Sequence, residues 1–196
     1  MKKIAITGNI ASGKSEVEKI ISELGFKILD TDKVSHDILN KDDEAKKEIL
    51  SIFGSDILDN GSISRKKLAE IVFKDKDKLT RLEKIIHPLV FKKIGEFFAQ
   101  NKNEEMCFVS IPQLFETRTQ AAFDKVLLIS AKEETRLKRL MKRNNLSEDE
   151  ARLRIDIQMS ESLKISKSDF VIYNDKDLNY LKEQVNCALT LLRLLP

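Results

Sequence analysis

The residues with the clearest chemical potential lie near the start of the chain, where a G-x-x-x-x-G-K-S pattern follows a short apolar run. The pattern is formed by Gly8, Asn9, Ile10, Ala11, Ser12, Gly13, Lys14 and Ser15. Glycines permit backbone torsions with which successive N–H groups can surround phosphate oxygens. A lysine at this position can reach the β- and γ-phosphates of a nucleotide, and the hydroxyl after it can ligate Mg²⁺. The pattern therefore predicts a nucleotide-phosphate site in which Lys14 neutralises charge and Ser15 holds the metal.

The residues on either side of this loop predict the strand and the helix that would hold it. Residues 4–6 form an apolar run, as expected of a parallel strand buried on both faces. Apolar residues then recur at helical spacing over 17–24, and Gly25 suits the end of that helix. An ordinary glycine turn is the alternative. A helix beginning at the loop would direct its positive dipole end at a phosphate, so the context favours nucleotide binding.

The composition indicates a globular protein with room for one α/β domain and small insertions. The chain has 196 residues, of which 41% are hydrophobic and 34% charged. Its 35 basic and 32 acidic side chains nearly balance, which gives no reason to expect a nucleic-acid partner. No apolar run approaches the length of a membrane span, and residues 2–7 are needed as the first strand rather than as a signal peptide. We therefore expect a cytoplasmic protein without a membrane partner, as a monomer or a weak homo-oligomer.

Five strand candidates and the segments between them predict a parallel sheet with two insertions. Strands are expected at 3–7, 27–29, 106–111, 125–129 and 170–173. Helices are expected after caps at Ser64, Asp75, Ser130 and Ser147, ending near residues 73, 88, 143 and 160 respectively. About 75 residues separate the second and third strands, far more than one crossover helix needs, so we interpret them as a helical insertion.

These elements predict an α/β protein of the P-loop NTPase fold. We expect a five-stranded parallel sheet flanked by helices, with a helical substrate-binding insertion and a small helical lid. In this interpretation the nucleotide-binding core comprises 1–32, 104–136 and 158–196, the insertion 33–103, and the lid 137–157.

Two aspartates follow the second strand candidate, in the segment Leu29-Asp30-Thr31-Asp32. Because ligands bind beyond the carboxyl ends of parallel strands, both carboxylates are expected near a nucleotide held by the loop. A carboxylate there can orient or deprotonate an acceptor hydroxyl, or hold a water bound to Mg²⁺. A helix N-cap is the alternative role for Asp32, and the two roles can coexist.

Three arginines, Arg136, Arg139 and Arg143, share one face of the helix expected after the fourth strand. Phosphoryl transfer needs such cations over the transferring group, whose charge spreads onto its equatorial oxygens. A solvated helix face, with Glu133 and Glu134 as partners, is the alternative. The phosphate loop upstream favours the first interpretation.

The signatures of other nucleotide-binding classes are missing from the sequence. Residues 40–43 fit the N-K-x-D pattern that reads guanine, but they follow the second strand too closely. No glycine has an aspartate three residues before it, as the D-x-x-G signature of switch GTPases requires. No strand candidate ends in Asp-Glu, as a motor or DNA-handling ATPase would usually need. A small-molecule kinase with a core, an insertion and an arginine-bearing lid fits best.

The order of motifs along nearly the whole chain resembles that of the dephospho-coenzyme A kinases. Residues 7–15 are similar to the family's T-G-x-I-x-S-G-K-S, and Asp30 and Asp32 match its D-x-D. Residues 60–68 are similar to D-G-x-(I/L)-x-R-x-x-L, with Arg65 at the arginine, and the apolar residues 71–73 follow. The remaining matches are His87-Pro88, the segment from Ile111 to Glu116, Arg139-Leu140, Arg143, Arg154-Ile155, Gln158-Met159, Lys164, Asp169 and Asn174.

Five positions depart from the family pattern: Asn9, Glu16, His36, Gln113 and Ser168. Asn9 stands where glycine is usual, and Glu16 where threonine often follows the serine. We expect Glu16 to face away from the phosphates, near the positive end of the helix dipole. His36 stands at a place often held by arginine, which affects the details of acceptor binding.

The resemblance implies transfer of the γ-phosphoryl group of ATP, with Mg²⁺, to the ribose 3′-hydroxyl of dephospho-coenzyme A. It implies catalytic roles for Asp32, as the base, and for Lys14 and Arg139. The loop with Glu16, Arg139 and Arg143 would bind ATP, and Ser15 the metal. The acceptor is then expected at Asp32, His36, Arg65, His87 and Glu116. On physical grounds alone, roles for His87 and Glu116 stay open, as does another acceptor such as a nucleoside monophosphate.

Overall fold

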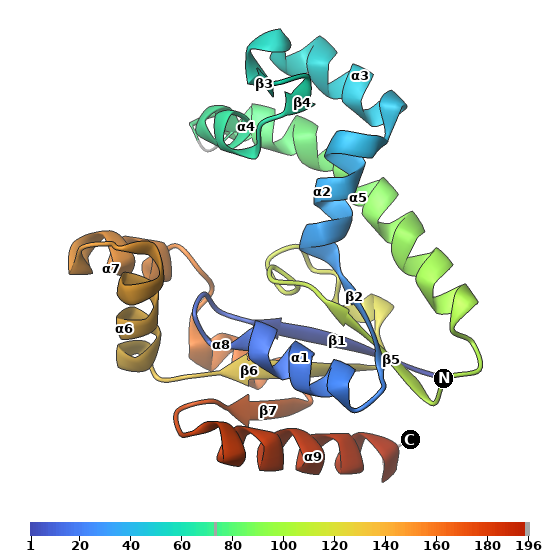
Figure 1. Cartoon of the computed structure of the whole chain (residues 1–196), viewed down its shortest axis with the longest axis vertical. Coiled ribbons are helices and arrows are strands. Elements are labelled where there is room, and N and C mark those ends of the chain that lie inside the picture. Colours follow the sequence, from blue (N-terminus) through green and yellow to red (C-terminus); the bar gives the residue numbers. More distant parts are fainter. Residues whose placement is uncertain (73, 195–196) are drawn as a thin grey trace. The chain divides into compact units, whose positions relative to one another are not determined.

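The computed structural model describes residues 1–72 and 74–194, and these form two compact units (Figure 1). One unit comprises Met1–Ile28 with Asn101–Pro196, and the other comprises Leu29–Gln100. Each unit is described by itself. The five-part division expected from the sequence assigns functions to segments and stays a prediction.

The main sheet has five parallel strands, as predicted. They are β1 (Lys2–Gly8), β2 (Lys27–Asp30), β5 (Met106–Ser110), β6 (Lys125–Ser130) and β7 (Phe170–Tyr173), in the spatial order β2-β5-β1-β6-β7. In the register of the central strands Ile6 lies opposite Ser110, and Gly8 lies opposite Ile129. The strand β1 is central and its last five residues are buried, which explains why its sequence is continuously apolar instead of alternating.

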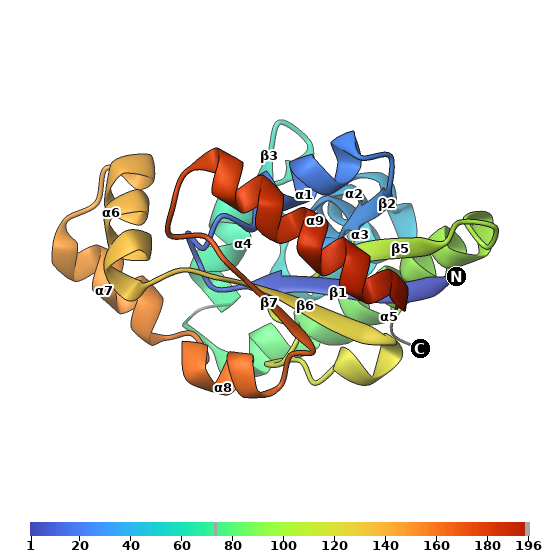
Figure 2. The same ribbon diagram turned by 90° about the horizontal axis from the view of Figure 1, so that it is seen from below.

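Helices cover both faces of this sheet (Figure 2). The helices α1 (Lys14–Glu23) and α9 (Leu178–Leu194) pack on one face, where Ile6, Phe108 and Ile172 meet Ile21 and Val185 in a single apolar cluster. The short helix α8 (Glu161–Ser166) lies on the other side of the strands and contacts β6. Burial of these apolar side chains stabilises the packing of α1 on β1, and therefore the position of the loop that joins them.

A helical pair follows β6 and occupies most of the segment predicted as the lid. It consists of α6 (Glu133–Asn144) and α7 (Glu148–Asp156), which pack through Leu137, Leu140, Ala151 and Ile155. The predicted capping box of Ser147 and Glu150 is present at the start of α7.

Two of the predicted boundaries in this region are wrong. Ser130 does not cap α6, because it is the last residue of β6, paired with Tyr173, and the helix begins after Lys132. The helix α7 ends at Asp156 rather than near residue 160, and α8 begins as a separate helix at Glu161.

The second unit is mainly helical, as expected for the insertion. It contains α2 (Thr31–Lys41), α3 (Asp43–Phe53), a 3₁₀ turn (Ser55–Ile57), a short hairpin of β3 (Leu58–Asp59) and β4 (Ser62–Ile63), α4 (Arg65–Val72) and α5 (Lys76–Gln100). Residue 73, the predicted end of α4, lies outside the described residues. Asp75 caps α5 as predicted, accepting hydrogen bonds from the backbone N–H groups of Asp77 and Lys78.

The helix α5 does not end near Pro88 as predicted but continues to Gln100. Proline removes the hydrogen bond to the carbonyl four residues earlier, here that of Lys84. Both Pro88 and Lys84 are exposed, so water can reach this carbonyl. The buried residues Ile85, Val90 and Ile94 lie on both sides of the proline, and their burial holds the helix together.

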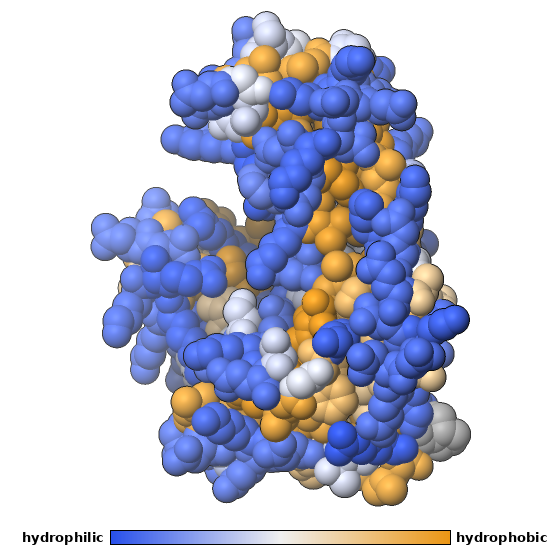
Figure 3. Space-filling model, turned by 45° about the vertical axis from the view of Figure 1, so that its right-hand side comes forward, coloured by the Kyte–Doolittle hydropathy of each residue, from blue (hydrophilic) through white to orange (hydrophobic). Residues whose placement is uncertain are grey.

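No helix within the described ranges is both long and apolar enough to cross a membrane. On the face shown in Figure 3, apolar side chains occur in patches between charged and polar ones.

Candidate nucleotide-phosphate site

The loop between β1 and α1 has the backbone conformation that phosphate binding requires. Ala11 and Gly13 have positive φ values of 61° and 93°. Within residues 1–72 and 74–194, the backbone N–H groups of Ala11, Gly13, Lys14 and Ser15 have no hydrogen-bond acceptor. Orphaned donors at a helix N-terminus, next to the positive end of its dipole, form a site for an anion.

The two glycines of the motif are required by their surroundings. A Cβ atom on Gly8 would lie 2.6 Å from both the carbonyl oxygen of Ile129 and the hydroxyl of Ser12. A Cβ atom on Gly13 would lie 1.9 Å from Nδ2 of Asn174. The motif therefore reflects close packing against β6 and the end of β7 as well as torsional freedom.

Asn174 and Arg139 support the loop from outside. The buried Asn174 donates from Nδ2 to the carbonyl oxygen of Ser12 at 2.9 Å. Arg139 donates to the carbonyl oxygens of Asn174, at 2.9 Å, and of Ser12, at 3.4 Å. The carbonyl oxygen of Ser12 therefore accepts from both side chains, which fixes the loop from its acceptor groups and does not engage its N–H groups.

The side chain of Lys14 has two partners within the same unit. Its Nζ lies 2.8 Å from Oε1 of Glu18, one turn further along α1. It also donates to the hydroxyl of Ser110, at the end of β5, and this hydroxyl donates to Glu18. Lys14 is therefore held next to the loop by a carboxylate that sequence reasoning did not single out.

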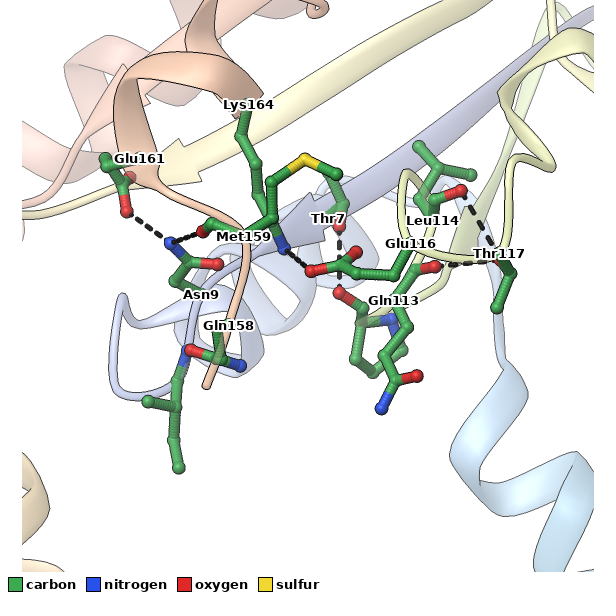
Figure 4. Close-up of polar contacts among 12 residues, drawn as sticks. Thr7, Asn9, Gln113, Leu114, Glu116, Thr117, Gln158, Met159, Glu161 and Lys164 are labelled. Carbon is green, nitrogen blue, oxygen red and sulfur yellow. Dashed lines mark hydrogen bonds and ion pairs between the residues drawn. The ribbon is translucent and has the colours of Figure 1, made fainter. Parts of the chain in front are cut away.

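The other end of the loop is bound by the segment between α7 and α8 (Figure 4). The backbone N–H of Ile10 donates to Oε1 of Gln158 at 2.8 Å. Nδ2 of Asn9 donates to Oε2 of Glu161 at 2.8 Å and to the carbonyl oxygen of Met159 at 3.2 Å. Asn9 stands where the family pattern usually has glycine, and its side chain bonds the loop to this segment. The residue is only 4% exposed.

The predicted site residue Glu116 lies in the turn after β5 and forms an ion pair with Lys164 of α8 (Figure 4). The distance from Oε1 to Nζ is 2.8 Å, and Lys164 is fully buried while the Glu116 side chain is 26% exposed. A buried ammonium needs such a partner, because an unpaired buried charge is strongly destabilising. Glu116 therefore has a structural task, and its role in acceptor binding stays a prediction.

The three arginines of the predicted row have different environments. Arg136 is only 4% exposed, donates to the carbonyl oxygen of Ala131 and lies 3.7 Å from Glu161. Arg143 is exposed and bonds to the neighbouring Asn144. The structure therefore does not place the three guanidinium groups in one common environment, and Arg139 is the one that reaches the phosphate loop.

The remaining candidates lie in the second unit. Asp30 is the N-cap of α2 and accepts hydrogen bonds from the backbone N–H groups of Asp32 and Lys33. The capping role considered for Asp32 therefore belongs to Asp30, and Asp32 lies in the first turn of the helix. His36 is also on α2, near Asn40. Arg65 begins α4 and is exposed, and His87 is half-buried in α5.

Sequence reasoning assigned no role to Asn174, Gln158, Glu161 or Glu18. A polar residue directly after an apolar parallel strand is a recognisable signal, and Asn174 follows β7 in this way. Gln158 was matched only through the resemblance and Glu161 was not singled out, because both reach the loop only through the tertiary fold.

The chemistry of the loop suits a nucleotide with Mg²⁺. Over the described ranges, no cluster of three or more His, Cys, Asp or Glu side chains could hold a metal ion. Mg²⁺ usually keeps several waters and is bound through substrate phosphates with one or two protein oxygens. The hydroxyl of Ser15, in the first turn of α1 and beside the orphaned N–H groups, fits that requirement.

These features define the class of the protein. A parallel sheet in which a phosphate loop joins a central strand to the first helix is the P-loop fold. Shikimate kinase from Bacteroides thetaiotaomicron shares the fold, with a TM-score of 0.59 at 12% identity over 97% of this chain and 98% of that one. The protein thus belongs to the class of P-loop proteins by its fold.

The particular family is identified by closer relatives. The family description of dephospho-CoA kinase matches residues 2–179. The chain is 40% identical over 189 residues, 94% of each chain, to a dephospho-CoA kinase of Listeria monocytogenes serotype 4b (strain F2365). Among solved structures, dephospho-CoA kinase from Campylobacter jejuni has a TM-score of 0.74 at 33% identity, covering 98% of this chain and 97% of that one. TT1252 from Thermus thermophilus has a TM-score of 0.86 at 31% identity, covering 97% of each. The chain belongs to the dephospho-CoA kinase family, which confirms the resemblance found in the sequence.

Proposed function

We propose that this protein transfers the γ-phosphoryl group of ATP to the ribose 3′-hydroxyl of dephospho-CoA, giving CoA and ADP, the last step of CoA biosynthesis. The observation that carries the proposal is the set of four orphaned N–H groups in the loop of a chain that belongs to this family. Such donors suit the phosphates of a nucleotide donor, and the family supplies the acceptor.

In this proposal the phosphate loop, residues 8–16, holds ATP through its backbone N–H groups. Lys14 neutralises charge on the β- and γ-phosphates, and Ser15 would hold Mg²⁺, which would supply further positive charge to the phosphates. Arg139, already bonded to the loop, and Arg143 stabilise charge on the transferring group when the helices α6 and α7 close. Closure also excludes water, which limits idle hydrolysis of ATP.

Asp32 is the proposed base. The transition state of phosphoryl transfer is largely dissociative, so a carboxylate suffices to position the hydroxyl and to accept its proton late. Support for this role comes from Asp30, which caps α2 and so relieves Asp32 of that task. We further propose that the insertion, residues 33–103, binds dephospho-CoA through His36, Arg65 and His87, with Glu116 contributing from the core.

The setting of the reaction is also part of the proposal. We infer a cytoplasmic enzyme, a monomer or a weak homo-oligomer, without a nucleic-acid or membrane partner. The near balance of 35 basic and 32 acidic side chains supports the absence of nucleic acid. Light scattering after size-exclusion chromatography measures the oligomeric state directly.

The test is a coupled ADP-release assay with ATP and MgCl₂, in which dephospho-CoA is compared with a panel of nucleoside monophosphates. The proposal expects turnover with dephospho-CoA and none above background with the panel. Turnover only with a monophosphate would contradict the acceptor while leaving the phosphate loop intact. Silence with every acceptor, in a preparation shown to be folded, would contradict the reaction as a whole.

A further inference from the structure

A carboxylate lies unexpectedly close to the lysine of the phosphate loop. Oε1 of Glu18 is 2.8 Å from Nζ of Lys14, and the two side chains are 15% and 16% exposed. The hydroxyl of Ser110 completes a triangle, accepting from Lys14 and donating to Glu18. All three residues belong to the unit that contains the loop.

This triangle has a cost if the loop binds a nucleotide. A lysine paired with a carboxylate offers less positive charge to phosphate oxygens, and a carboxylate near those oxygens repels them. A cation that arrives with the nucleotide reverses both effects, because it attracts the carboxylate and leaves the ammonium to the phosphates. The arrangement is therefore suited to a nucleotide that binds together with Mg²⁺.

P-loop enzymes ordinarily hold their Mg²⁺ with the Ser or Thr of the loop and an aspartate that follows a neighbouring strand. Here the neighbouring strand β5 ends in Ser110, which lies opposite Ile6 of β1, and the next residues are Ile111 and Pro112. The position at which a carboxylate would be expected thus carries a hydroxyl, and that hydroxyl is bonded to Glu18.

We propose that Glu18 supplies, from helix α1, the carboxylate of the Mg²⁺–nucleotide site, with Ser110 as its support. Glu18 lies three residues after Ser15, so both side chains occupy the same face of α1. Glu18 is a positioning residue: together with Ser15 it would hold the hydrated metal, and Lys14 is its counter-ion in the structure. The inference rests on the proposed nucleotide binding and adds a residue to it.

The experiment measures the affinity for ADP by isothermal titration calorimetry, without Mg²⁺ and at a series of MgCl₂ concentrations. ADP is used because it undergoes no turnover. In Glu18→Gln the side chain keeps its size and loses its charge. We expect ADP affinity without Mg²⁺ to be unchanged or higher, because Lys14 is no longer neutralised. The Mg²⁺ concentration needed for the metal-dependent gain should rise about 10- to 100-fold, the usual effect of losing a group that orients metal ligands.

Two further variants make the test specific. Glu23→Gln removes an acid from the same helix, where Glu23 is 58% exposed and lies 3.9 Å from Lys19, and it should behave as the parent chain. Glu18→Ala combined with Ser110→Asp moves the carboxylate to the end of β5. Because the Ser110 hydroxyl already contacts both Lys14 and Glu18, this pair should restore the Mg²⁺ dependence that Glu18→Ala alone loses.

The outcomes separate the inference from the proposed function. If the parent chain binds ADP with a Mg²⁺ dependence that Glu18→Gln shares, the inference on Glu18 is overturned and nucleotide binding stands. Parallel loss of affinity with and without Mg²⁺ would also overturn it, since it would indicate a structural role only. If the parent chain binds no ADP, the proposed function itself fails. If Glu18→Gln does not fold, the double variant with Glu18→Ala and Ser110→Asp provides the test. A Mg²⁺ dependence of ADP binding in this variant that differs from that of the parent chain overturns the inference.

Discussion

Replacing Gly13 by alanine tests whether the phosphate loop depends on its contact with the last strand of the sheet. The added Cβ atom would lie 1.9 Å from Nδ2 of Asn174, at a residue with a φ of 93°. An L-residue in this left-handed region costs about 1–2 kcal/mol. Displacing Asn174 breaks its bond to the carbonyl oxygen of Ser12 and leaves buried polar groups unpaired, which costs about 1–3 kcal/mol more. Gly13→Ala should therefore lower the free energy of unfolding by about 2–5 kcal/mol.

Gly25→Ala is the matched control. Gly25 has nearly the same φ, 91°, but among the described residues nothing lies within 4 Å of its added Cβ. It belongs to the same unit as Gly13, so both changes are read in the same unfolding transition. Urea denaturation followed by far-ultraviolet circular dichroism should show a loss of only about 1–2 kcal/mol for Gly25→Ala.

The difference between these two variants measures the clash alone. Adding Asn174→Ala to Gly13→Ala removes the clashing group, so the double variant should lose less than the sum of the single losses. Equal destabilisation by Gly13→Ala and Gly25→Ala, or strict additivity with Asn174→Ala, would refute the reasoning.

Three further substitutions probe the proposed site, and a fourth probes the N-cap of α7. Lys14→Ala should reduce kcat/KM at least about 10²-fold in the ADP-release assay, since a main electrostatic contact is lost; a change of a few-fold would contradict its role. Asp32→Asn should leave the calorimetric affinity for ATP nearly intact and lower kcat about 10²- to 10⁴-fold, whereas normal turnover would remove Asp32 from the mechanism. Arg139→Ala should lower kcat more than it raises KM, because it acts chiefly on the transition state; an unchanged kcat would limit Arg139 to supporting the loop. Ser147→Ala removes the N-cap of α7 and should cost about 1 kcal/mol in urea denaturation near neutral pH. The backbone N–H of Ser147, which alanine keeps, is the main cause that holds the pKa of Glu150 below its usual range. The stability from this bond is complete above about pH 4.5 and is lost as the pH falls, so the parent and Ser147→Ala should both weaken in acid while the difference between them changes little. A loss from Ser147→Ala that disappears in acid would contradict this reasoning.

The sheet could be predicted from the sequence because buried parallel strands appear as short apolar runs. All five strands were placed within two residues of their observed ends, including the weakly apolar β2. The hairpin of β3 and β4 was missed because its strands have two residues each, although Asn60-Gly61 between them is typical of such turns. The helix end predicted near Pro88 was wrong. The local propensity of proline indicated that the helix would stop there, but apolar residues buried on both sides of the proline keep α5 continuous.

The candidate site was predictable to the extent that it is contiguous in the chain. The loop from Gly8 to Ser15 can be recognised from its own residues, whereas the role of Asp32, expected from its place after a strand, stays a prediction. Arg136 and Arg139 are three residues apart, yet one is buried against Glu161 and the other bonds to the loop. Helical periodicity indicates which residues share a face, but what that face contacts depends on residues of other elements, such as Ser12, 127 positions from Arg139.

The bond between Asn174 and Ser12 joins groups that are 162 residues apart in the chain. A ribosome therefore releases the phosphate motif long before the side chain that braces it. Because domains generally fold as units, an emerging chain that lacks β7 has the motif in its sequence without the braced loop in its structure. Nucleotide should accordingly fail to stabilise nascent chains until β7 and Asn174 have been synthesised, and a chain shortened before Asn174 should resist rescue by ATP.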